Sequence, residues 1–169
     1  TQLRALLRAA VYGNLSVMYP MITSEEEVAK IQKIVKEVEN ELTKEGVPYQ
    51  IPEQGIMIET PAAVMVSDEL AQMVDFFSIG TNDLLQFTLG MDRENERMEK
   101  YFDPHHPAIL KMLRIVANNV HLEEKPISIC GDMAADLSLT EFFLQIGIDE
   151  LSVAPGQVLA LRKKIREIQ

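Results

Sequence analysis

The chain has 169 residues, of which 47% are hydrophobic and 25% charged, proportions that suit one compact domain over residues 1–169. A formal net charge of −10 without any basic run argues against nucleic acid as a partner. No apolar stretch approaches the roughly 20 residues of a membrane span, and the single cysteine, Cys130, excludes an internal disulfide. We therefore expect a cytoplasmic protein without membrane insertion.

The first predicted element is a helix at the very start of the chain. Apolar residues recur there at the spacing of one helix face: Leu3, Leu6, Leu7 and Ala10. Because there is no initiator Met before this pattern, we expect the chain to open inside a helix of a longer protein.

A strand and a helix follow as the first of five similar units. LSVMY (15–19) is the strand. In the capping box that follows, the Ser24 hydroxyl and the Glu27 carboxylate satisfy free amides at a helix start. Gly46 and Pro48 end this helix, and its predicted buried stripe comprises Val28, Ile31, Val35, Val38 and Leu42.

The second and third units repeat this order. GIMIE (55–59) is a strand, and the helix after it has Thr60 as N-cap and Pro61 at its first position, with its end near 72–74. DFFSIG (75–80) is the third strand, from which a long polar connection leads to a helix over about 107–121.

The last two units complete an alternating pattern. PISICG (126–131) precedes a helix over 136–147, and DELSV (149–153) precedes a helix with Val158, Leu161, Ile165 and Ile168 on its apolar side. This order, with strands apolar on both faces, predicts a parallel sheet with helical crossovers. The open doubly wound sheet and the (β/α)8 barrel both fit, and both place function at the carboxyl ends of the strands.

The residues at those strand ends are rich in oxygen ligands. Without His or a second Cys, they favour a hard cation such as Mg²⁺ over zinc, with substrate oxygens completing the coordination. The candidates are Met21, Glu59, Asn82, Asp83, Cys130, Gly131, Asp132 and Ser152.

Each principal candidate also has a purely structural interpretation. Glu59 could cap a helix, Asp83 could be a turn residue, and Cys130 could be a small core side chain. Arg93 could be a solvated surface charge. We favour a functional site because separate segments deliver these groups to the same end of one sheet.

Four motifs carry a family resemblance, and they follow one another in a specific order and spacing. GIMIETPAA (55–63), DFFSIGTNDLLQFTLGMDREN (75–95), YFDPHHPAIL (101–110) and ICGDMAAD (129–136) resemble the C-terminal, phosphoenolpyruvate-binding domain of Enzyme I of the bacterial sugar phosphotransferase system. The resemblance extends through SVMYPMI and DELSVAP to cover nearly the whole chain. It implies a (β/α)8 TIM-type barrel, of which this chain covers about the last five βα units. Pyruvate phosphate dikinases and phosphoenolpyruvate synthases are alternatives, and a carbon-carbon lyase is a weaker one.

The resemblance implies a role for each motif residue. Glu59 and Asp83 would hold Mg²⁺, Asn82 and Asp83 would contact phosphoenolpyruvate, and Arg93 would bind its phosphate. Cys130 would move a proton to or from the methylene carbon. In the family, the phosphoryl group passes to an enzyme histidine and then to the phosphocarrier protein HPr for sugar uptake, and the enzyme is a homodimer.

Two departures from the family pattern stand out. Asp132 replaces the usual Glu after the Cys-Gly pair, and Ala135 replaces the usual Gly before Asp136. The arginines of the earlier barrel strands and the domain with the phosphorylated histidine are absent. We therefore expect the isolated chain to be inactive and to associate through open barrel edges, and an inactive structural or dimerisation fragment is the alternative function.

Overall fold

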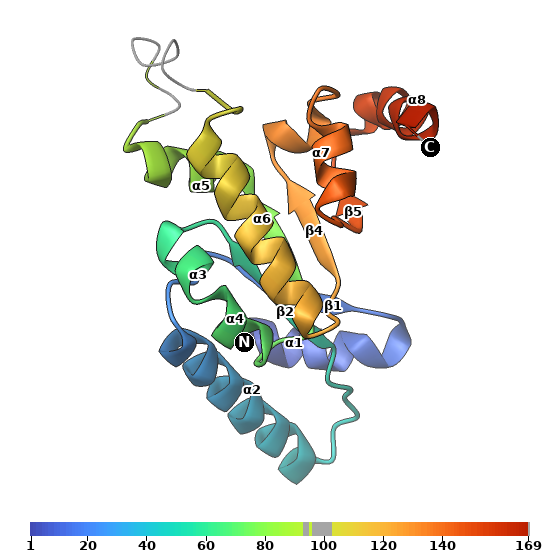
Figure 1. Ribbon diagram of the computed structural model, residues 1–169. Helices are drawn as coiled ribbons and strands as arrows, with labels where there is room; N and C mark the ends of the chain where they lie inside the picture. Colours follow the sequence, from blue (N-terminus) through green and yellow to red (C-terminus); the bar gives the residue numbers. More distant parts are fainter. Residues whose placement is uncertain (93–94, 96–102, 169) are drawn as a thin grey trace.

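The computed structural model describes residues 1–92, 95 and 103–168. Within these residues, five parallel strands form one sheet in chain order (Figure 1), which confirms the predicted α/β class. They are β1 (Ser16–Tyr19), β2 (Glu53–Ile58), β3 (Phe76–Gly80), β4 (Ile127–Cys130) and β5 (Glu150–Leu151). Because neighbouring strands all run in the same direction, their carboxyl ends meet at one edge of the sheet.

The helices lie between and around these strands. In Figure 1, α3, α4 and α6 are stacked beside one face of the sheet, with α6 crossing in front of the strands. The helices before β3 are α1 (Gln2–Ala9), η1 (Ala10–Tyr12), α2 (Glu25–Glu45), α3 (Pro61–Met65) and α4 (Ser67–Ala71). Those after β3 are α5 (Thr81–Leu89), α6 (Pro107–Leu122), η3 (Asp132–Ala135), α7 (Thr140–Gln145), η4 (Pro155–Gln157) and α8 (Val158–Ile168).

Helix α2 begins and ends where the sequence predicts. The Glu27 amide donates to the Ser24 hydroxyl at 3.4 Å, and the Glu27 carboxylate accepts a hydrogen bond from the Thr23 amide at 2.7 Å. At the other end, Gly46 adopts a left-handed φ of 66°, which closes the helix at low steric cost.

The core lies between the sheet and its helices. Alternate residues of the three central strands face this core and are completely buried or nearly so: Ile56, Ile58, Phe77, Ile79, Ile127 and Ile129. The expectation that the strands are apolar on both faces is wrong. Alternation sends Ser78 and Ser128 to the opposite face, which lines an open cavity of about 440 Å³ together with Ser16, Cys130 and Ser152.

Two predicted helices differ in the structure. The expected helix over 60–74 is broken at Val66, with φ −115° and ψ 23°, and the Ser67 hydroxyl there donates to the Val64 carbonyl. The expected polar connection after the third strand starts with α5, which buries Leu84 and Leu85. The GTND sequence resembles a turn, but it forms the N-terminal end of this helix.

The last two helices also depart from the prediction. Residues 136–147 contain only the short helix α7, which starts at Thr140, and η3 lies just before this range. In α8, Leu161 is buried, whereas Val158 is exposed. None of the helices in the described part of the chain is both long and apolar enough to cross a bilayer.

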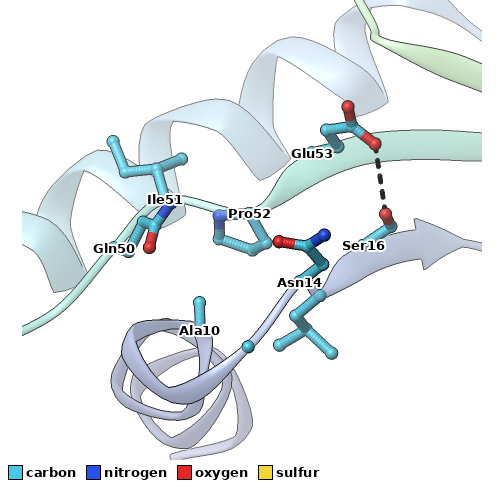
Figure 2. Close-up of a pocket in the computed structure, with 9 residues that line it drawn as sticks. Ala10, Asn14, Ser16, Gln50, Ile51, Pro52 and Glu53 are labelled. Carbon is cyan, nitrogen blue, oxygen red and sulfur yellow. Dashed lines mark hydrogen bonds between the residues drawn. The ribbon is translucent and has the colours of Figure 1, made fainter.

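A second cavity, of about 300 Å³, lies at the opposite end of the strands from their carboxyl ends. Figure 2 shows Ser16 and Glu53 at the start of β1 and β2, joined by a hydrogen bond of 3.2 Å, with Asn14 and Gln50 nearby. Sites in parallel α/β barrels form at the carboxyl ends. The functional site is therefore expected at the carboxyl ends of these strands.

Candidate functional site

Glu59 follows β2 directly and is almost completely buried, with 4% of its surface exposed. The Met21 amide donates a hydrogen bond of 2.7 Å to its Oε1 atom. Burial raises the pKa of Glu59, the Met21 hydrogen bond opposes this rise, and the negative charge of Asp83 adds to it. The fold therefore buries a carboxylate whose charged form would be better solvated in water.

Asn82 and Asp83 lie in the first turn of α5, immediately after β3. The Asn82 Oδ1 atom accepts a hydrogen bond of 2.9 Å from the Asp132 amide. The buried Thr81 hydroxyl donates to the Cys130 carbonyl at 2.7 Å. These two bonds fasten the start of α5 to the end of β4.

Gly131 permits this attachment. Its φ of 90° favours glycine, and a Cβ atom there would lie 2.4 Å from the Thr81 hydroxyl and 2.6 Å from Asn82 Oδ1. A side chain would therefore separate the two segments.

Cys130 ends β4 and is partly exposed on the cavity face of the sheet. Its thiol donates to the Ile79 carbonyl at 3.5 Å, and the Ser78 hydroxyl donates to its sulfur at 3.8 Å. Burial raises the pKa of Cys130, the Ser78 contact opposes this, and the charges of Glu59 and Asp83 raise it further. The thiol thus stays protonated at neutral pH, and it lies close enough to both carboxylates for their charges to affect its pKa.

The structure brings together Glu59, Asp83 and Cys130, the residues expected from three separate segments. Asn82 is placed beside them by α5. Arg93 lies outside the described residues, so its role remains a prediction.

Sequence reasoning missed the supporting groups Ser78, Gly80 and Thr81. The FSIGT run held a usable signal, because Ser78 and Gly80 alternate with the apolar Phe77 and Ile79.

The two carboxylates suit a divalent cation. Among the described residues, neither Glu59 nor Asp83 has a Lys or Arg within ion-pair distance, so their mutual repulsion has no local counter-charge there. Nor do three His, Cys, Asp or Glu side chains of the described residues form a metal-binding cluster. Two carboxylates without a third ligand fit Mg²⁺, which is commonly bound through one or two carboxylates plus substrate phosphate oxygens.

The chain matches known proteins over its full length. Residues 1–169 match the family model described as PEP-utilising enzyme, PEP-binding domain. The phosphoenolpyruvate-protein phosphotransferase of Priestia megaterium is 44% identical over 169 residues, covering 99% of this chain and 30% of that protein. The Bacillus subtilis protein of the same name is 41% identical with the same coverage. The chain therefore spans about 30% of the length of these curated relatives.

Solved structures support the barrel-type α/β fold. A citrate lyase from Burkholderia xenovorans matches 96% of this chain and 52% of its own, with TM-score 0.70 and 21% identity. A pyruvate kinase from Cryptosporidium parvum matches 96% of this chain and 34% of its own, with TM-score 0.66 and 11% identity. At these identities the likeness concerns the fold alone, so it does not favour a lyase.

Proposed function

Because the chain belongs to the family of PEP-utilising enzymes through their PEP-binding domain, we propose that it is the substrate-binding part of a phosphoenolpyruvate-protein phosphotransferase. The observation that carries this proposal is the convergence of Glu59 and Asp83 beside the thiol of Cys130. In the complete enzyme, the phosphoryl group passes to a histidine outside this chain and then to HPr. We further propose that this enzyme is a cytoplasmic homodimer.

The site binds its substrate through charge and hydrogen bonding. Glu59 and Asp83 would hold Mg²⁺, which when bound supplies positive charge beside the phosphoryl and enol oxygens. The Asp132 amide occupies Asn82 Oδ1, so the Nδ2 group of Asn82 is oriented as a donor to a substrate oxygen. Arg93 would contribute a guanidinium fork, whose geometry matches phosphoryl oxygens.

Cys130 completes the reaction by protonating carbon. The bond between phosphorus and the enol oxygen breaks, its electron pair stays on that oxygen, and the histidine nitrogen forms the new bond to phosphorus. The resulting enolate takes a proton at its methylene carbon from the Cys130 thiol, which gives pyruvate. The thiolate then recovers a proton from water. A raised pKa suits this donor because the thiol is protonated when the enolate forms.

Calorimetric titration with phosphoenolpyruvate, with and without Mg²⁺, tests the proposal. We expect binding that depends on Mg²⁺ and is lost in Glu59→Gln and in Asp83→Asn. Glu53→Gln is the matched control, because this glutamate lies at the opposite end of the same strand. Binding that is unchanged in both site variants would refute the proposal. No binding by the unsubstituted chain would favour the alternative of an inactive structural fragment.

A further inference from the structure

We propose that Met21 is a positioning residue for the Glu59 carboxylate, and that its left-handed backbone conformation exists to present its amide to that group. The inference rests on the proposed function, because it assumes that Glu59 holds a divalent cation. It concerns a residue just beyond β1, whose side chain has no assigned role.

The backbone at Met21 is unusual. Its φ is 58°, and among the described residues the other non-glycine with positive φ is Glu124, just after α6. A left-handed conformation costs free energy in residues with a Cβ atom, because that atom crowds the carbonyl oxygen. Strain of this kind persists when surrounding contacts enforce it, and it is concentrated at functional sites.

Two hydrogen bonds enforce this turn from the end of β2. The Met21 amide donates to Glu59 Oε1 at 2.7 Å, and the Thr60 hydroxyl donates to the Ile22 carbonyl at 2.8 Å. Ile22 is 3% exposed and belongs to the core, whereas the Met21 side chain is 47% exposed. The turn thus buries Ile22, leaves the thioether outside and aims one amide at the carboxylate.

The amide also determines which carboxylate oxygen remains available. Oε1 is engaged by Met21, while Oε2 lies over the Cα atom of Gly80, where an added Cβ would approach it to 2.7 Å. Hydrogen bonds from groups behind a metal ligand orient it and tune its affinity. Met21 therefore leaves Oε2 as the oxygen for a cation shared with Asp83.

Mn²⁺ binding to the protein, followed by electron paramagnetic resonance of the free ion, tests this inference. Met21→Val disfavours the left-handed region because valine is branched at Cβ, whereas Met21→Gly and Met21→Asn tolerate it. We expect about 10-fold weaker Mn²⁺ binding in the Val variant, at the lower end of the usual effect of such supporting groups. The Gly and Asn variants should stay close to the unsubstituted protein. Met65→Val, at a 70% exposed position of α3, is the matched control.

Each result decides between a positioning amide and other roles. Equal affinity in the Gly, Asn and Val variants, with binding weakened by Glu59→Gln, would overturn the inference and leave the proposed function standing. Weakening in all three Met21 variants would assign the effect to the thioether and also overturn it. No Mn²⁺ binding by the unsubstituted protein, even with phosphoenolpyruvate present, would overturn both proposals. If the Val variant fails to fold, Met21→Ala replaces it, and affinity equal to that of Met21→Gly is the overturning result.

Discussion

Replacing Gly80 by alanine should damage the site through steric contacts with Glu59, and the new Cβ would also lie 2.9 Å from Met57 Sδ. The new Cβ would lie 2.7 Å from Glu59 Oε2, about 0.7 Å inside the 3.4 Å at which ordinary contact begins. The backbone itself accepts alanine, because its φ is −84°. Glu59 is buried and held by the Met21 amide, so the carboxylate must leave its position to make room.

The size of the effect follows from this displacement. A misplacement of about 1 Å costs on the order of 100-fold in rate, so 0.7 Å predicts a loss of roughly 10-fold to 100-fold, or about 1.4 to 2.7 kcal/mol of transition-state stabilisation. Overpacking costs about 1–3 kcal/mol of folding stability. Replacing a strand glycine by alanine also lowers the entropy of the unfolded chain, which stabilises the fold by roughly 0.5–1 kcal/mol and offsets part of the overpacking cost. The Gly80→Ala variant should therefore remain folded.

Turnover of phosphoenolpyruvate by the full-length protein and Mn²⁺ affinity are the two assays. Gly156→Ala is the control, because its Cβ would meet no atom within 4 Å. Both values should fall in Gly80→Ala and stay unchanged in the control. A Gly80→Ala variant with the control's turnover and affinity would refute the claim that the Glu59 carboxylate must stay over Gly80.

Three further predictions concern titration and proton transfer. Burial, with the charge of Asp83, raises the pKa of Glu59, so metal-free protein should lose stability as pH rises through that raised value. Thermal unfolding of Glu59→Gln, measured without divalent cations, should lack this loss. Parallel pH profiles of the melting temperature in the two proteins would contradict the prediction. Cys130→Ala should slow solvent-deuterium entry into the methyl group of pyruvate while phosphoenolpyruvate binding persists; loss of both would indicate a packing residue. Burial raises the pKa of Asp136, but hydrogen bonds from Ser138 and His105 outweigh it and leave a net lowering. This stabilisation holds above the unfolded pKa of about 3.9 and is lost as pH falls through the lower folded value. Asp136→Asn should lower the free energy of unfolding by about 0.5–1 kcal/mol at pH 7 and weaken its dependence on acid pH in urea unfolding. Equal acid sensitivity of the two proteins would exclude a contribution from the Asp136–His105 pair.

The strands and most of the helices were predictable because their signals are local. Ser24 and Gly46 mark both ends of α2 through side-chain and backbone chemistry that acts within a few residues. Helix α5 was missed because Gly, Asn and Asp favour turns, and its burial of Leu84 and Leu85 depends on contacts with distant elements. The polar positions on the cavity face of the sheet were missed because Phe76, which lines the same cavity, and Phe77 make β3 look apolar throughout.

The candidate site was predictable in its residues but not in its supports. Glu59, Asp83 and Cys130 each end a recognisable segment, and parallel topology brings such ends together. The Met21 amide reaches Glu59 across 38 positions in the sequence, and the Asp132 amide reaches Asn82 across 50. No local sequence pattern specifies a left-handed backbone at Met21 or hydrogen bonds between positions so far apart in the sequence.

The attachment of α5 to β4 has a mechanical consequence. Thr81 and Asn82 bind the Cys130 carbonyl and the Asp132 amide, so two hydrogen bonds fix the spacing between the segments that carry Asp83 and the thiol. Glu59 is anchored separately, to the turn after β1. Sliding of β2 against β3, which pair at Ile58 and Ile79, would change the gap between the carboxylates and leave the spacing of Asp83 and the thiol intact. The contacts that hold the Glu59 carboxylate therefore differ from the hydrogen bonds that join Asp83's segment to the Cys130 segment.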